Sequence, residues 1–492
     1  MMKRYIPWTI LAVFVAYVAV SLSDWRATSR DGFELAKFGR LPVAFAGRVR
    51  PMDTVARMGL LQVRGTADVP LAEGAGRFSI GGASLSATEW LLEVLIKPDV
   101  ADSRRIFPVS EPALVSKLGL QPTAGGYYAF KDLALHDAQI GTEAGRIAKV
   151  GLPKRAPWER ELVALQLRLA SYERLKNSLQ ANSLLQRDAK GAPLQYDMMA
   201  LLTTYRANLA EAAKVATRRQ RGAPVQLDKQ KAADMMAFAR PFTTVSRVAV
   251  VAMIPPARPG DARDSWKNMG AAIVDSARSG RLPAPVTHLA AITSAFAHGT
   301  PDAFNRLVDV YGQWLASNAL GPAMQRARFE SFYNVLQPYV KAVAFYLVAL
   351  MLICAAWVSR SETLYRSGML VAALAIAAHI TGLLIDMMLS GRLPVFSLLG
   401  WMVLGSWMLA LGAFVMERSN WLGRGRAVAI GTGVTLATLV TAHGLAPGGL
   451  TLLVAEVVDL RLAVAVLVAL LVLPLGRERT IAAPAAAEAV PA

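Results

Sequence analysis

The sequence has few of the residues that carry covalent and metal chemistry. It contains one cysteine and five histidines among 492 residues. The single cysteine, Cys354, excludes an intramolecular disulfide and a CxxC pair for thiol exchange. HExxH and Gly-x-Ser-x-Gly motifs are absent, so nothing indicates a zinc protease or an α/β-hydrolase. His136, His288 and His298 have no metal-ligand partner at a useful spacing, and we interpret them as surface or core histidines.

Acidic residues are also scarce, with 35 Asp and Glu against 53 Lys and Arg and a net charge of +18. Such an excess is found in nucleic-acid-binding proteins. Here, however, the basic residues are scattered, and the one short cluster is RRQR at 218–221. We therefore predict no nucleic-acid partner.

Apolar runs of membrane-spanning length are missing from residues 24–335 but occur on both sides of them. The chain is 54% hydrophobic, and its mean hydropathy is +0.36. At the N-terminus, Lys3 and Arg4 precede an apolar run that no Ala-x-Ala site follows. This favours a retained anchor over a cleaved signal peptide. The C-terminal part predicts five spans, at 338–358, 368–388, 397–416, 427–446 and 450–474.

Arginines in the short loops give the orientation of these spans, because cytoplasmic loops are rich in Lys and Arg. Alternate loops carry them, and the opposite short loops offer only Arg392. We predict a multi-pass protein of the bacterial inner membrane with both termini in the cytoplasm and its large domain in the periplasm. The expected parts are an anchor (1–23), an extracytoplasmic domain (24–335), a transmembrane bundle (336–476) and a disordered cytoplasmic tail (477–492).

The fold class expected from these patterns is an α-helical integral membrane protein whose extracytoplasmic domain is mostly helical with some β-structure. Residues 157–179 have apolar side chains at spacings of three and four, which indicates an amphipathic helix. Similar patterns recur around 195–219, 265–278 and 302–335. Shorter β-like pieces occur at 77–85 and 244–254.

Four stretches, in this order, are similar to segments of one protein family. They are FGRLPVAFAGRVRPMDTVARMGLLQVRG (38–65), EWLLEVLIKPDVADSRRIFPV (89–109), ARFESFYNVLQPYVKAVAFYLVALML (327–352) and ITGLLIDMMLSGRLPVFSLLGWMVLGSW (380–407). Together they resemble the CcsA/ResC-like cytochrome c assembly proteins of system II cytochrome c biogenesis. The resemblance implies a protein that carries haem out of the membrane and presents it to apocytochrome c. In that family histidines ligate the haem iron, and a tryptophan-rich loop cradles the porphyrin.

On this resemblance, His379 and His443 are the candidate haem-binding histidines, and His379 is the candidate iron ligand. Trp401 and Trp407 are the candidate aromatic contacts. The alternatives are an interhelical hydrogen bond for each histidine, and membrane anchoring or packing for each tryptophan. We expect His379 to face the interior of the bundle, because a polar side chain in contact with lipid costs insertion energy.

The sequence also departs from the family pattern. The WGxxWxWD loop is absent, residues 397–401 read SLLGW where the family has NLYES, and Asp386 replaces an arginine. The last span lacks the family's Trp and His.

The chain thus resembles the front part of such a protein, with no catalytic residue of its own. We therefore expect a CcsA-like or ResB-like membrane protein and apocytochrome c as its partners. The competing hypothesis is a diverged membrane-anchored scaffold without haem. A transporter ranks third, since Asp386 is its only polar site and no inverted repeat is visible.

Overall fold

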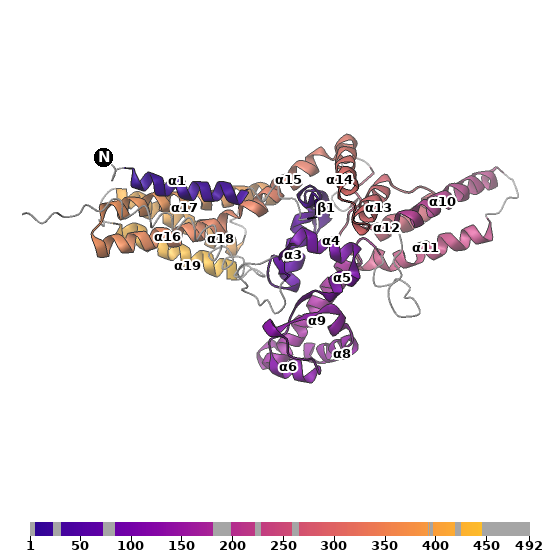
Figure 1. Ribbon diagram of the computed structural model, residues 1–492, viewed down its shortest axis with the longest axis horizontal. Helices are drawn as coiled ribbons and strands as arrows, with labels where there is room; N and C mark the ends of the chain where they lie inside the picture. The colour runs from indigo at the N-terminus through magenta and orange to yellow at the C-terminus, as the bar shows by residue number, and fades with distance from the viewer. Residues whose placement is uncertain are drawn as a thin grey trace, which may run out of the picture. The chain divides into compact units, whose positions relative to one another are not determined.

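The computed structural model describes residues 5–22, 31–71, 84–180, 198–221, 228–257, 265–391, 393, 397–418 and 425–444. It is mostly helical, with 77% of the described residues in helices (Figure 1). The chain divides into two compact units. The membrane-type unit contains α1 and the helices from α16 to α19, and the second unit spans Ser23–Val335.

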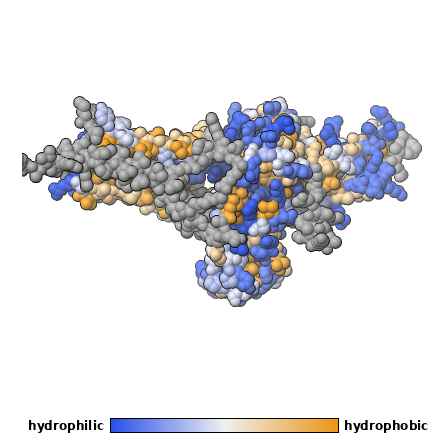
Figure 2. Space-filling model, in the orientation of Figure 1, coloured by the Kyte–Doolittle hydropathy of each residue, from blue (hydrophilic) through white to orange (hydrophobic). Residues whose placement is uncertain are grey.

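The described part of the membrane-type unit contains five apolar helices. They are α1 (Ile6–Ser21), α16 (Pro338–Ser359), α17 (Glu362–Ser390), α18 (Leu398–Arg418) and α19 (Arg426–Gly444). Their core joins α1 to α16, where the rings of Phe14 and Phe345 meet edge to face with centroids 5.7 Å apart. Figure 2 shows hydrophobic side chains over the outer surface of these helices. Large apolar residues are exposed there, as expected for contact with lipid: Val358, Met388, Leu398, Met408 and Val415.

Three helices in the described part of the chain are long and apolar enough to cross a membrane. They are the helical run Pro301–Ser359, which ends in α16, and the helices α17 and α18. Of the predicted anchor and five spans, the structure thus has helices of spanning length at three: 338–358, 368–388 and 397–416. Helix α1 has 16 residues and so measures about 24 Å, less than a hydrocarbon core of roughly 30 Å. The apolar part of α19 is similarly short, and the predicted span 450–474 and tail 477–492 lie outside the described residues.

The second unit packs short strands and many helices around one hydrophobic core, with Trp90, Phe107 and Tyr172 fully buried. The strands described in this unit form three antiparallel pairs: β1 (Pro42–Phe45) with β2 (Arg48–Pro51), β3 (Asp68–Pro70) with β4 (Ser84–Ser86), and β5 (Arg105–Pro108) with β6 (Tyr127–Ala129). Its first helices are α2 (Leu35–Gly39), α3 (Met52–Val63), α4 (Ala87–Ile96), α5 (Pro98–Ser103), α6 (Pro112–Lys117), α7 (Phe130–Ala134), α8 (Asp137–Ala148) and α9 (Pro157–Lys176). The later ones are α10 (Met198–Gln220), α11 (Lys229–Val248), α12 (Met269–Ser279), α13 (Ala284–Ala297), α14 (Pro301–Leu315) and α15 (Gly321–Leu336).

Local sequence accounts for most of these elements. The amphipathic pattern at 157–179 becomes α9, which buries Leu162, Leu165 and Leu169 on one face. The strand expected at 244–254 is wrong over its first half. Helix α11 continues to Val248, because Phe242 and Val245, three residues apart, place their side chains in the core. Only isolated bridges follow, at Ala252 and Ile254.

Candidate functional site

His379 lies in the interior of the membrane-type unit, with none of its side chain exposed. The prediction that it faces the interior of the bundle is confirmed. Its Nδ1 lies 3.4 Å from the hydroxyl oxygen of Tyr346 on α16. The rings of Tyr339 and Tyr346 approach the imidazole edge to face, with centroids 5.9 and 6.0 Å away.

The spacing of residues along α16 and α17 brings these groups together. Tyr339 and Tyr346 are seven residues apart, so they lie two turns apart on one face of α16. His379 and Asp386 repeat this spacing on α17, and the Tyr339 hydroxyl donates to Asp386 Oδ2 at 3.1 Å. Gly382 lies between them, and a Cβ at this position would meet the ring of Tyr339 at 2.8 Å. The two helices therefore share a polar seam that requires a glycine at its middle.

The other candidate residues do not gather around His379 as a set. Trp407 on α18 is half-buried, and its indole N–H donates to the carbonyl of Ile376, one turn before His379. Trp401 is 55% exposed near the start of α18. His443 lies in the last turn of α19, and its side chain is outside the described residues. Among the candidates whose side chains the structure describes, Trp407 is the one that lies near His379.

The surroundings of His379 do not fit a haem group. An axial histidine presents one nitrogen to the iron at the centre of a flat macrocycle, which needs open space beside the imidazole. Here two tyrosine rings cover the imidazole, and no part of its side chain reaches the surface. Ligation would require α16 and α17 to separate. The observed arrangement is that of an interhelical hydrogen bond in an apolar bundle.

A second polar cluster lies in the second unit and was not expected from the sequence. At its centre Glu330 of α15 is only 5% exposed. Its Oε1 accepts a hydrogen bond from Thr54 at 3.0 Å and lies 3.2 Å from Arg48 Nη2 and 3.6 Å from Arg50 Nη1. We call this group the Glu330 cluster; its members are Arg48, Arg50, Asp53, Thr54, Arg57, Thr88, Glu330 and Asn334.

Asp53 forms the other half of the Glu330 cluster. Its carboxylate accepts from Arg57 Nε at 3.0 Å and from the amide of Asn334 at 2.9 Å. Asn334 also donates to Thr54 Oγ1 at 2.8 Å, which joins the two halves. A further bond comes from the hydroxyl of Thr88, at 3.3 Å. The cluster thus connects three parts of the chain that are up to about 280 residues apart.

The local fold explains how these side chains converge. Strands β1 and β2 form a hairpin whose two turn residues, Ala46 and Gly47, have φ of +48° and +77°, as a tight hairpin turn requires. Arg48 and Arg50 alternate along β2 and so share one face. Asp53 follows in the first turn of α3, where an acidic side chain is favoured by the helix dipole.

The positive charge of Arg50 is only partly compensated within the cluster. Burial lowers the pKa of this guanidinium from its usual value, and the neighbouring charge of Arg48 lowers it further, while Glu330 acts in the opposite direction. The sequence did carry one signal for the cluster. Polar residues recur in RVRPMDTVAR and ESFYN, two stretches already noted for their resemblance, and Glu330 and Asn334 are four residues apart on one helix face.

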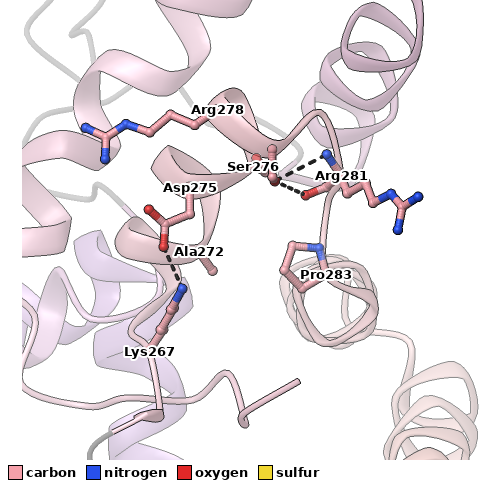
Figure 3. A pocket seen from close by; sticks show the side chains of 8 residues that line it. Lys267, Ala272, Asp275, Ser276, Arg278, Arg281 and Pro283 are labelled. Carbon is pink, nitrogen blue, oxygen red and sulfur yellow. Dashed lines mark hydrogen bonds and ion pairs between the residues drawn. The ribbon is translucent and has the colours of Figure 1, made fainter. Parts of the chain in front are cut away.

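The described residues offer little else that resembles a ligand site. A cavity of about 410 Å³ lies beside α12, but its charged groups diverge (Figure 3). Lys267 pairs with Asp275 at 2.7 Å, whereas Arg278 and Arg281 point away from each other. Within the described part of the chain, no three His, Cys, Asp or Glu side chains are grouped so that they could hold a metal ion.

Comparison with known proteins gives no independent assignment. No family model matches the chain, and no curated protein matches it. A functional hypothesis therefore depends on the quoted motifs and on what their residues contact in the structure.

Proposed function

We propose that this chain is a membrane subunit of system II cytochrome c maturation. It helps bind, channel or position haem for attachment to apocytochrome c, together with a membrane partner that carries the tryptophan-rich loop. The chain itself contributes no catalytic residue. Three apolar helices of spanning length support a role in the membrane.

The Glu330 cluster is the observation that carries this proposal. Two of the four stretches that resemble CcsA/ResC-like proteins, 38–65 and 327–352, are separated by more than 260 residues. Their polar residues nevertheless bond to one another, through Glu330, Thr54 and Asn334. These contacts support the proposal to the extent that both stretches belong to one packed unit.

The enclosure of His379 limits what this chain does with haem. With its ring covered by Tyr339 and Tyr346, His379 is not available as a ligand in this arrangement. In the proposed complex the axial ligands come from the partner, and this chain supplies the site where the partner docks. Trp401, which is exposed on α18, remains available for such a contact.

The second candidate function is a membrane-anchored assembly scaffold that has lost contact with haem. The enclosure of His379 favours this second function, since a fully buried histidine between tyrosine rings can hold two helices together without any cofactor. Purification from native membranes separates the two functions. The first predicts co-purification of the partner with a Soret absorbance band in the eluate. Co-purification of the partner without Soret absorbance would instead support the scaffold function.

Replacing His379 with alanine tests its role directly. The seam between α16 and α17 loses its hydrogen bond, and we expect thermal stability to fall modestly, by roughly 1 kcal/mol. The haem content of the native complex should not change. The Soret absorbance per mole of protein measures this. A loss of haem that added imidazole partly restores would instead identify His379 as an iron ligand and contradict the structural role.

The proposed location is the bacterial inner membrane, with the second unit in the periplasm. A tag at either terminus should then be protected in intact spheroplasts, and a tag inserted at residue 220, at the end of α10, should be digested by added protease. Immunoblots before and after lysis provide the measurement. Protection of the tag at 220 in intact spheroplasts would reverse the orientation.

A further inference from the structure

The Glu330 cluster contains one more positive than negative charge. Its ionised members are three arginines and two carboxylates. Arg57 pairs with Asp53, with 3.0 Å between Nε and Oδ2. Arg48 and Arg50 must therefore share the single carboxylate of Glu330, at 3.2 and 3.6 Å. An incompletely compensated charge beside a buried carboxylate is costly, and a further anion would reduce that cost.

Neither guanidinium of this pair uses all of its donors. The Nε atoms of Arg48 and Arg50 are buried and have no hydrogen-bond partner among the residues that the structure describes. One Nη of Arg50 is directed to the sulfur of Met58 at 3.4 Å, which is a weak acceptor. The side chains of Arg48 and Arg50 are 32% and 16% exposed, so each reaches solvent through atoms other than its buried Nε.

We propose that Arg48 and Arg50 form a binding site for one oxyanion, a carboxylate or phosphate group of a ligand. The planar guanidinium fork matches both groups and binds them through charge-assisted hydrogen bonds. A bound anion brings the cluster to charge balance. It also opposes the two effects that lower the pKa of Arg50, which are burial and repulsion from Arg48. The site does not depend on the proposed function in cytochrome c maturation.

The test uses the full-length protein in detergent micelles, titrated with inorganic phosphate, succinate or chloride at constant ionic strength. An anion present at ten times its Kd should raise the midpoint of thermal unfolding by roughly 3–5 °C. The rise should saturate for phosphate, for succinate or for both, and this distinguishes the phosphate from the carboxylate class. Chloride should have no saturable effect. Equal responses to all three salts would overturn the proposal.

Variants locate the site. R48Q and R50Q should each weaken the apparent affinity by about tenfold, since each removes charge-assisted bonds to the anion. R278Q removes an exposed arginine elsewhere in the second unit and should bind as the wild type does. Should R48Q or R50Q fail to fold, E330Q provides the second measurement. It removes the carboxylate that competes for the two arginines, so the anion should bind more tightly than in the wild type. Unchanged affinity in E330Q would contradict the site.

Discussion

Replacing Glu330 with glutamine is expected to destabilise the second unit by about 3 kcal/mol, the low end of the range for breaking a buried ion pair. The glutamine amide keeps the shape of the side chain but loses its charge. Arg48 and Arg50, whose side chains are 32% and 16% exposed, then lose the carboxylate that they share. The bond that Thr54 donates becomes weaker, because its acceptor is no longer ionised.

Thermal unfolding of the purified protein measures this effect, and the midpoint should fall by roughly 5–10 °C. Glu143→Gln is the matched control. It breaks an ion pair of shorter distance, 2.7 Å to Arg146, but the side chains of Arg146 and Glu143 are 56% and 35% exposed. Exposed pairs contribute little, so the midpoint should stay unchanged. An unchanged midpoint in Glu330→Gln, as expected for the control, would contradict the role of Glu330 in a buried ion pair.

A methyl group at Gly270 should be the other strongly destabilising change. Gly270 lies in the first turn of α12, which packs directly on the backbone of α11. A Cβ at this position would overlap the backbone nitrogen of Ser246 and lie 2.6 Å from the carbonyl oxygen of Phe242. These are main-chain atoms that no rotamer change can move. We expect Gly270→Ala to cost about 3 kcal/mol or more, since overpacking here must displace a whole helix.

Gly145→Ala is the matched control for this steric argument. Gly145 is also helical, in α8, but nothing lies within 4 Å of the added Cβ. Alanine restricts the unfolded chain, so this variant should be more stable than the wild type by roughly 0.5–1 kcal/mol. The two substitutions are chemically identical and should have effects of opposite sign on the midpoint of chemical unfolding. Destabilisation by both, or by neither, would refute the close approach of α12 to α11.

The helices of the membrane-type unit follow from the sequence, since long apolar runs are stable as helices where no water is available to the backbone. The burial of His379 follows from the cost of exposing a polar side chain to lipid. Its neighbours do not. That Tyr339 and Tyr346 enclose the imidazole depends on how α16 and α17 are rotated against each other, and an apolar helix with little amphipathic character does not encode that rotation locally. The packing of Tyr339 and Tyr346 against the imidazole argues against His379 as a haem ligand.

By itself the sequence determined where the apolar helices lie, that 24–335 lacks a run of spanning length, and which four stretches resemble CcsA/ResC-like proteins. The tertiary structure alone decided that two of those stretches meet. Asp53 and Thr54 near the start of the second unit bond to Asn334 near its end, and Glu330 lies beside two arginines. Local patterns arise from backbone geometry over a few residues, and these can be read along the chain. A contact across 280 residues depends on the packing of the whole core between them, so only the folded structure contains it.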